Sequence, residues 1–471
     1  MVTATPADLR KRLAADPHRP RFHFLPPANW MNDPNGFIQW RGQWHLFYQH
    51  NPFGPLWGNM HWGHAVSNDL VYWSDLPMGL APTPGGPDES GCFSGCAVDN
   101  GGVPTFIYTA TRGAHHEIQT QCLATSEDGL RTWQKYAQNP VLSEVPPEAK
   151  QTRDFRDPFV WRESDGWWYM VLGSRIQDVG GVIFLYRSQD LIRWEYLHPL
   201  LTGDIQQTGV GWECPNFFKL DDRWVLIISI YTLDGINKVI YYVGSYENQR
   251  FTPISEGILD YGVLYAPLST LDDQNRRVLI GWLRETRSNE AMQAAGWSGV
   301  QSIPRVLTLD AQNRLCMTPI KLDAIRGTKH HFEGRVVDGH FPLDVRGSAL
   351  DVEAVFEPQT SGQCGIALAC SADGRQRLEV VYDADTQQLR VREVSPAIQQ
   401  EQAAPHMLEP QERLHLRILL DGSVVEIIAN ERTSLTYRIY PTQAADNGVQ
   451  LIGKQARLHS LDIWEMVSIW D

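Results

Sequence analysis

The sequence has no uninterrupted apolar run that approaches the roughly 20 residues of a membrane-spanning helix. Its mean hydropathy is -0.32. Hydrophobic residues make up 42% and charged residues 20% of the chain, which is typical of a soluble globular protein. We therefore predict no membrane partner. At 471 residues the chain has room for two or three domains.

Positive charge is also scarce. The 55 Asp and Glu residues outnumber the 41 Lys and Arg residues and give a formal net charge of -14 at pH 7. A protein that binds the phosphate backbone of a nucleic acid needs positive charge to displace counterions. We therefore predict no nucleic-acid partner, and the sequence gives no indication of the oligomeric state.

Metal and nucleotide motifs are missing. The seven cysteines form no Cys-x-x-Cys pair, so free thiols are favoured over a disulfide framework or a zinc site. Histidine pairs at positions 61 and 64, 115 and 116, and 330 and 331 have no accompanying acidic ligand pattern. The Gly-Gly pairs at 85 and 180 are not followed by the Lys-Ser/Thr of a phosphate-binding loop. We expect no metal and no cofactor.

Targeting signals are missing as well. The first twenty residues contain charges and prolines where a signal peptide needs a continuous apolar stretch, and no Asn-x-Ser/Thr sequon occurs. We expect a cytoplasmic protein, or a secreted one if the N-terminus has been trimmed.

Aromatic residues, by contrast, are abundant and recur at a regular spacing. Trp73, Trp133 and Trp194 each end a segment that begins with Ser and contains an Asp, and they are 60 and 61 residues apart. Five apolar runs, rich in β-branched and aromatic residues, begin at positions 44, 105, 168, 224 and 278. A repeat of this length, with little helical periodicity, is typical of propeller blades. The pattern predicts a five-bladed β-propeller.

The repeat also predicts the domain organisation of an all-β chain. We expect an N-terminal segment at 1–28, the propeller at 29–320, a linker at 321–332 and a second domain at 333–471. In the last of these regions the tryptophan repeat disappears, and short alternating strands are separated by turns such as Asp421-Gly422. This pattern favours a β-sandwich.

Acidic residues recur at one point of the repeat. Counting back eleven residues from the strand starts at 44, 168 and 224 gives Asp33, Asp157 and Glu213, and the same count from 105 gives Ser94. The first strand of each blade lines the channel of a propeller, so these side chains should converge. Asp-Pro pairs at 33 and 157 are also compatible with simple strand-entry turns. Three acids at one repeat position are better explained by chemistry, because clustered like charges are costly.

Clustered carboxyl groups suit glycoside hydrolysis. The reaction needs one carboxyl group to protonate the leaving oxygen and another to attack or to activate water. A third can stabilise the positive charge of the transition state. The acids therefore predict a glycosidase.

Three motifs around these acids resemble those of glycoside hydrolase family 32, the invertase, inulinase and levanase group. They are Trp30-Met31-Asn32-Asp33-Pro34-Asn35-Gly36, Phe155-Arg156-Asp157-Pro158 and Trp212-Glu213-Cys214-Pro215. Further similarity lies in 47–52, in Trp57-Gly58-Asn59, in Phe93-Ser94-Gly95, in Tyr265-Ala266-Pro267, in 296–305 and in 421–426. The resemblance covers nearly the whole chain and implies a five-bladed propeller followed by a C-terminal β-sandwich.

The resemblance also implies roles for residues. Asp33 is expected to be the ionised nucleophile, Glu213 the general acid and then base, and Asp157 the transition-state stabiliser, with retention of configuration. The substrate pocket is expected to contain Asn32, Gln49, Trp57, Phe93, Ser94 and Arg156.

The function expected from this resemblance is that of a retaining β-fructofuranosidase that hydrolyses sucrose and short fructo-oligosaccharides. The partner would be a small carbohydrate. An exo-fructanase acting on inulin or levan, a sucrose-6-phosphate hydrolase and a five-bladed arabinan-degrading enzyme are enzymatic alternatives. A carbohydrate-binding propeller is the alternative without catalysis.

Overall fold

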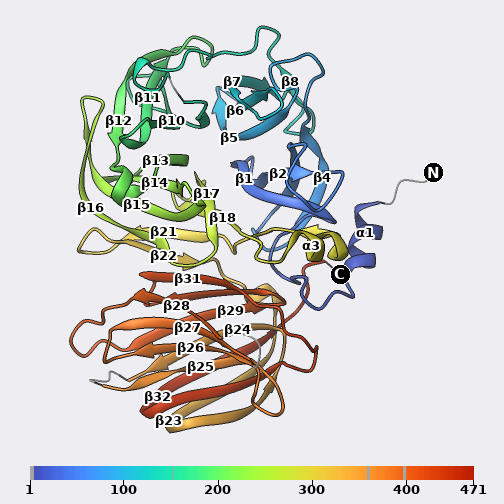
Figure 1. The fold of residues 1–471 in the computed structure, drawn as a ribbon, viewed down its shortest axis with the longest axis vertical. Helices are drawn as coiled ribbons and strands as arrows, with labels where there is room; N and C mark the ends of the chain where they lie inside the picture. The colour runs from blue at the N-terminus through green and yellow to red at the C-terminus, as the bar shows by residue number, and fades with distance from the viewer. Residues whose placement is uncertain (1–4, 151, 358–360, 396–398, 471) are drawn as a thin grey trace. The chain divides into compact units, whose positions relative to one another are not determined.

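The computed structural model describes residues 5–150, 152–357, 361–395 and 399–470, and almost all of its regular structure is β-strand (Figure 1). Contacts between Cα atoms divide the chain into two compact units. The first contains Leu25–Leu259 and Leu264–Leu315, and the second contains Arg10–Phe24, Asp260–Val263 and the chain from Cys316 onward. No helix among the described residues is long and apolar enough to cross a membrane.

The described residues of the first unit form five sheets. The first sheet contains β1 (Asn29–Trp40), β2 (Gln43–Asn51), β3 (His61–Ser67) and β4 (Trp73–Leu80). The second contains β5 (Gly91–Asn100), β6 (Val103–Arg112), β7 (Ile118–Thr125) and β8 (Gln134–Lys135). The third contains β9 (Phe155–Arg162), β10 (Trp168–Ile176), β11 (Gly180–Ser188) and β12 (Glu195–Thr202). The fourth is β13 (Gly211–Leu220), β14 (Arg223–Thr232), β15 (Gly235–Glu247) and β16 (Arg250–Asp260). The fifth contains β17 (Leu264–Leu271), β18 (Arg277–Leu283), β20 (Val300–Gln301) and β21 (Arg305–Leu309), and the boundary between the units falls inside the next strand, β22 (Leu315–Pro319).

The five sheets form a ring. The first strands of the sheets, β1, β5, β9, β13 and β17, contact one another in this order, and β17 contacts β1 again (Figure 1). The ring is also tied by β19 (Trp297–Ser298), which pairs in parallel with the start of β1. Short helices α2 (Ile205–Thr208) and α3 (Asn289–Ala295) lie in the connections, and α1 (Pro6–Leu13) precedes the propeller. The predicted five-bladed propeller is confirmed.

The tryptophan repeat marks one turn of each of the first three blades. Between β3 and β4 the Ser67 hydroxyl accepts a hydrogen bond from the Leu70 amide at 2.8 Å, and Leu70 has a left-handed φ of 68°. The Trp73 indole then donates to the Leu70 carbonyl at 3.0 Å. The turn between β11 and β12 is closed in the same way by Ser188, Leu191 and Trp194. In the first and third blades the repeat is therefore a turn in which the hydroxyl and the indole satisfy the backbone. In the second blade the Ser126 hydroxyl accepts a hydrogen bond from the Leu130 amide at 2.9 Å, but the Trp133 indole N–H has no partner in the described parts of the chain.

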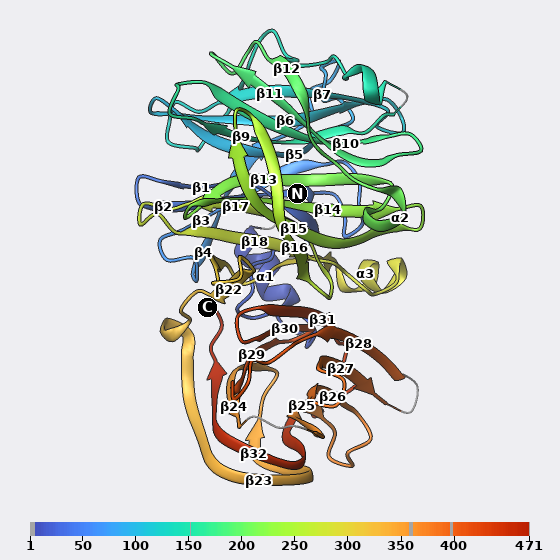
Figure 2. The ribbon, with the colours of Figure 1, turned by 90° about the vertical axis from the view of Figure 1, so that its left-hand side faces the viewer.

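The second unit is one sheet of ten strands among the described residues. Its strands are β23 (Arg326–Arg346), β24 (Ala349–Phe356), β25 (Gln363–Cys370), β26 (Arg377–Asp383), β27 (Gln388–Val394), β28 (Gln399–Pro405), β29 (Leu414–Asp421), β30 (Val424–Ala429), β31 (Thr433–Arg438) and β32 (Gly448–Met466). The first part of β32 pairs with β25 and the second with β24, so this strand passes from one face to the other (Figure 2). A core of aliphatic side chains fills the space between the faces. The predicted sandwich is confirmed.

A buried charge cluster holds the N-terminal segment of the second unit in place. The Asp421 carboxylate, at the end of β29, accepts hydrogen bonds from the backbone amides of Arg21, Phe22 and His23 at 2.7 to 2.8 Å. The His23 ring lies 2.9 Å from Asp421 on one side and 2.9 Å from Glu426 on the other, and all three side chains are buried. Burial alone lowers the pKa of His23, but the bonds to these two carboxylates outweigh it and raise the pKa to about 9.

This pKa predicts a pH-dependent contribution to stability. A histidine that titrates near 6.5 when unfolded and near 9 when folded contributes fully below pH 6.5, and the contribution is lost as pH rises through 9. We expect His23→Gln to destabilise the protein by about 3 kcal/mol at pH 6 and by much less at pH 10. Urea unfolding of the wild type and the variant at both pH values measures the difference.

His331→Gln provides the control for this experiment. His331 also pairs with a carboxylate of the second unit, Asp462, at 2.6 Å, but its side chain is half exposed. Water screens such a pair, so we expect a small effect at either pH. An effect of His23→Gln that is equal at pH 6 and pH 10 would contradict the assignment.

Candidate active site

The innermost strands share a local irregularity. In each of the five ladders between the first and second strand of a blade, the register shifts by one residue at the same level. The shifts lie between Met31 and Pro34, Cys92 and Gly95, Arg156 and Phe159, Glu213 and Asn216, and Tyr265 and Leu268. Such β-bulges re-aim side chains.

The bulges place consecutive residues on the same side of the strand. In a regular strand, neighbouring side chains point to opposite faces. Here four consecutive pairs line one pocket: Asn32 and Asp33, Phe93 and Ser94, Arg156 and Asp157, and Glu213 and Cys214. Asp157 and Cys214 have left-handed φ values of 64° and 47°, which residues other than glycine rarely adopt. The strain is located where the side chains converge.

A small cavity on the propeller axis shows which residues of the five innermost strands occupy equivalent positions. Pro34, Gly95, Pro158, Pro215 and Pro267 all line it, one from each blade. The residues that precede them are therefore equivalent: Asp33, Ser94, Asp157, Cys214 and Ala266. Glu213 lies one position earlier, with Asn32, Phe93, Arg156 and Tyr265.

The prediction that three carboxylates share one repeat position is therefore wrong for Glu213. Counted to the starts of the apolar runs at 44, 168 and 224, the distance from the axial proline is ten residues in the first and third blades and nine in the fourth. The first blade gains a residue through a second register shift between Asn35 and Ile38. The third gains one in its turn, where Glu163 bonds to Trp167, while the fourth closes its hairpin directly between Leu220 and Arg223.

The pocket above this axial level has a volume of about 620 Å³. All nine residues predicted from the sequence line it: Asp33, Asp157, Glu213, Asn32, Gln49, Trp57, Phe93, Ser94 and Arg156. It also contains residues that the prediction missed, among them Cys214, Tyr265, Asp154, Gln119, Arg153 and His116. Tyr265 stands in one of the quoted motifs, and Asp154 is one residue before another, so proximity to a motif is the signal that could have found them.

Asp33 is held by hydrogen bonds on both of its oxygens. Ser94 donates its hydroxyl to Oδ2 at 2.6 Å, and Asn32 donates its amide to Oδ1 at 2.9 Å. Asn32 is itself oriented by the Trp30 indole, which donates to it at 2.7 Å. Burial raises the pKa of Asp33 above its ordinary value, and these hydrogen bonds offset the effect only in part.

Asp157 lies between two blades. Its Oδ2 accepts the backbone amide of Cys214 at 3.0 Å, and the Arg156 guanidinium is 3.8 Å away. Burial raises the pKa of Asp157 to about 7, although Arg156 lowers it. The Cys214 sulfur is 3.6 Å from Asp33 and 3.5 Å from Asp157, so one thiol bridges the two carboxyl groups.

Glu213 faces a different set of groups. Arg156 donates to Oε1 at 2.8 Å, and the Tyr265 hydroxyl lies 2.6 Å from Oε2. Arg156 is fixed by a second carboxylate, Asp154, at 2.5 Å, and Asp154 is also bonded by Tyr231 at 2.9 Å. Arg156 thus joins Glu213 to a buried network and sets the orientation of its carboxyl group.

The pocket changes character toward its mouth. Trp57 is 50% exposed, and its ring lies edge-on to Phe93 at 6.1 Å and to His116 at 5.3 Å. Flat apolar faces of this kind pack on sugar rings. No group of three His, Cys, Asp or Glu side chains arranged to hold a metal occurs in the described parts of the chain.

Comparison with known proteins identifies the family. The model of the glycosyl hydrolases family 32 N-terminal domain matches residues 23–319, and that of the family 32 C-terminal domain matches 321–465. This chain belongs to glycoside hydrolase family 32. It is therefore a glycoside hydrolase, as the motifs indicated.

Named relatives of this family 32 enzyme differ in their substrates. A sucrose-6-phosphate hydrolase of Zymomonas mobilis is 36% identical, with 93% of this chain and 90% of the relative covered. A levanase of Bacillus subtilis is 33% identical, with 96% and 71% covered. The structure of fructan 1-exohydrolase IIa from Cichorium intybus has a TM-score of 0.86 at 27% identity and covers 96% of this chain and 98% of its own.

The Cys214 thiol generates a prediction about pH dependence. Its contact lowers the pKa of Asp33, so Cys214→Ala should raise that pKa further. The acid limb of the kcat/KM profile, which reports a carboxyl group that must be ionised, should then move to higher pH. Cys214→Ser keeps a donor and should restore the wild-type limb. Identical limbs in the alanine variant and the wild type would show that the thiol does not act on Asp33.

Proposed function

We propose that this family 32 enzyme removes terminal fructosyl units from sucrose and short fructo-oligosaccharides with retention of configuration. The observation that carries the proposal is the convergence of Asp33, Asp157 and Glu213 from three blades on one pocket. The family match supports the reaction class, and the exposed Trp57 at the mouth supports a sugar-binding pocket.

In the first half of the reaction, an Asp33 oxygen attacks the anomeric carbon of fructose, and the bond from that carbon to the leaving oxygen breaks. Glu213 gives its proton to the leaving oxygen. Asn32 donates a hydrogen bond to one carboxylate oxygen of Asp33 and Ser94 to the other, so both oxygens are oriented by fixed donors. Such fixed donors position the nucleophile before the substrate arrives.

In the second half, Glu213 takes a proton from water, and the resulting hydroxide attacks the same carbon and releases Asp33. Arg156 and Tyr265 fix the Glu213 carboxyl group through both steps. Asp157 binds fructose hydroxyls and stabilises the positive charge that develops on the ring.

The roles of the two carboxyl groups can be separated with an aryl fructoside, whose leaving group needs no protonation. On sucrose, Glu213→Ala should lose roughly 10²- to 10⁴-fold in kcat, the usual contribution of acid–base catalysis. On the aryl fructoside it should show a burst of aryl alcohol, because only deglycosylation still needs the base, and azide should relieve the block. Asp33→Ala should show neither burst nor rescue.

Pre-steady-state release of the aryl alcohol, with and without azide, measures both effects. Rescue of Asp33→Ala but not of Glu213→Ala would reverse the two assignments. Tyr231→Phe, which removes a hydroxyl bonded to Asp154 and not to either carboxyl group, is a control that should keep the wild-type order of steps.

Retention makes a prediction of its own. A fructosyl-enzyme on Asp33 reverses the configuration twice, so β-fructose should be the first product. NMR of the reaction before mutarotation identifies the first anomer. An initial α-fructose signal would exclude a covalent intermediate.

Sucrose 6-phosphate is a second candidate substrate, and the mouth of the pocket favours it. Arg153, His115 and His116 lie there, and Arg153 donates to the His115 carbonyl at 3.3 Å. A guanidinium at the leaving-group side could bind a phosphate on the departing sugar. The relative named sucrose-6-phosphate hydrolase supports this alternative. The cytoplasmic location expected from the sequence belongs to the same proposal.

Arg153→Gln distinguishes the two substrates. If the phosphate binds at Arg153, the variant should lose about fivefold in kcat/KM on sucrose 6-phosphate, the value of one exposed charged hydrogen bond, and little on sucrose. Arg112→Gln, an exposed arginine outside the pocket, is the matched control. Equal kcat/KM ratios for the two substrates in wild type and Arg153→Gln would exclude a phosphate role for Arg153.

A further inference from the structure

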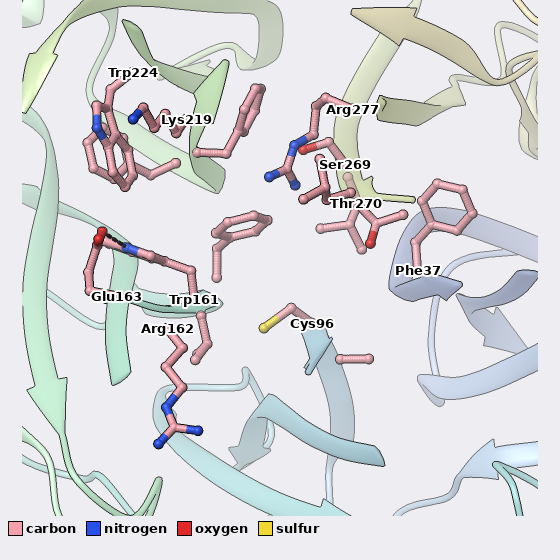
Figure 3. Close-up of a pocket in the computed structure, with 17 residues that line it drawn as sticks. Phe37, Cys96, Trp161, Arg162, Glu163, Lys219, Trp224, Ser269, Thr270 and Arg277 are labelled. Atoms are coloured by element: carbon pink, nitrogen blue, oxygen red, sulfur yellow. Dashed lines mark hydrogen bonds between the residues drawn. The ribbon is translucent and has the colours of Figure 1, made fainter. Parts of the chain in front are cut away.

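A second pocket, of about 410 Å³, lies at the other end of the channel (Figure 3). On β9, Arg156 and Asp157 line the active site, whereas 159–163 line the second pocket. On β13 the active site takes 213 and 214, and the second pocket takes 217–219. The ring of axial prolines lies between these levels, so the two pockets are separate.

The second pocket contains a cation without a partner. Arg277, the first residue of β18, points into it, and its guanidinium packs 4.4 Å from the centre of the Phe218 ring (Figure 3). Its Nε is buried and has no hydrogen-bond partner, and no ion pair to Arg277 occurs among the described residues. An unpaired buried donor is costly, so such groups normally have a partner.

A second polar group beside Arg277 is also unsatisfied. The Ser269 side chain on β17 is 3% exposed, and its hydroxyl has no hydrogen-bond partner. Leu271 is the register partner of Arg277, so Ser269, two residues before Leu271, lies on the same face of the sheet as Arg277, and both residues line the pocket (Figure 3). A guanidinium and a hydroxyl on one face provide donors for the oxygens of an anion.

The charge of the lining is positive, in contrast to the net charge of the chain. Arg162, Lys219 and Arg277 line the pocket, and Glu163 is the one carboxylate among its lining residues. Glu163 accepts the Trp161 indole N–H at 2.6 Å on the side of the pocket away from Arg277 (Figure 3). Among the residues that the structure describes, no carboxylate therefore pairs with Arg277, and burial lowers its pKa to about 9, which leaves it charged at neutral pH.

The remaining walls are apolar, and aromatic side chains form a large part of them. Trp161, Trp224, Phe37 and Phe217 line the pocket, whose volume lies within the range of small-molecule sites. Inorganic phosphate alone would leave most of this volume unfilled. Aromatic faces suit a sugar ring attached to the anion.

We propose that the second pocket binds a sugar phosphate, with the phosphate held by Arg277 and the Ser269 hydroxyl and the sugar packed against the aromatic walls. Arg277 supplies the planar, multiply donating group that phosphate oxygens prefer. Ser269 supplies a hydroxyl that has no other partner. The proposal does not depend on the substrate of the active site, because the two pockets share no lining residue.

Isothermal titration calorimetry with glucose 6-phosphate, inorganic phosphate and glucose tests the proposal. We expect wild-type enzyme to bind glucose 6-phosphate more tightly than inorganic phosphate, and glucose not to bind at this pocket. Arg277→Met keeps the contact with Phe218 and should weaken glucose 6-phosphate binding at least tenfold. Ser269→Ala should weaken it less. Arg162→Met should change it less than threefold, because the Arg162 guanidinium donates to the Gly166 carbonyl and points away from Arg277 (Figure 3).

Two further variants keep the result interpretable. Arg277→Met should hydrolyse sucrose at the wild-type rate, and this rate verifies that the variant folds. If Arg277→Met does not fold, Arg277→Lys takes its place in the binding experiment. Arg153→Gln reports binding at the mouth of the active site instead. Loss of glucose 6-phosphate binding in Arg153→Gln but not in Arg277→Met would overturn the proposal. The absence of saturable binding to the wild type at about 20 mM glucose 6-phosphate, a concentration well above the Kd of a specific site, would also overturn it.

Discussion

The one-residue shift in each innermost ladder is the constraint on which the active site depends. A propeller brings five strands to one axis, but regular strands would direct only every second side chain into the pocket. Because the ladders shift at the same level in all five blades, pairs such as Arg156 with Asp157 and Glu213 with Cys214 both face inward. Each of these strands therefore contributes two neighbouring side chains to the pocket, so that acids, a cation and the groups that orient them fit into one compact site.

The same constraint determines the electrostatics. Acids that approach one another from different blades repel, so each needs its own donors. Asp33 accepts hydrogen bonds from Ser94 and Asn32, and Asp157 accepts one from a backbone amide. Glu213 accepts hydrogen bonds from Arg156 and Tyr265. Within the described parts of the chain, Arg156 is the one guanidinium that reaches both Asp157 and Glu213, so it supplies the main positive charge beside the acidic cluster.

The sequence was sufficient for the architecture and for the membership of the pocket, but not for its geometry. The tryptophan repeat and the five apolar runs predicted the propeller, and the nine residues expected from the family resemblance meet in one pocket. The equivalence of Glu213 with Asp33 and Asp157 was misassigned because an extra residue in β1 and a longer turn after β9 are invisible in spacing alone. Unpaired donors such as Arg277 and Ser269 cannot be found from sequence, since pairing depends on neighbours from other blades.

The parallel pairing of β19 with β1 has a consequence for the order in which the protein becomes active. Asn29 and Trp30 pair with Trp297 and Ser298, and Gln301 donates its amide to the Asn32 carbonyl at 2.7 Å, directly beside the nucleophile. The strand that carries Asp33 is synthesised first, yet its backbone is fixed by residues made more than 260 positions later. In a nascent chain on the ribosome, the strand that carries Asp33 therefore lacks these contacts until the end of the fifth blade has emerged. We expect hydrolysis to begin only after that point.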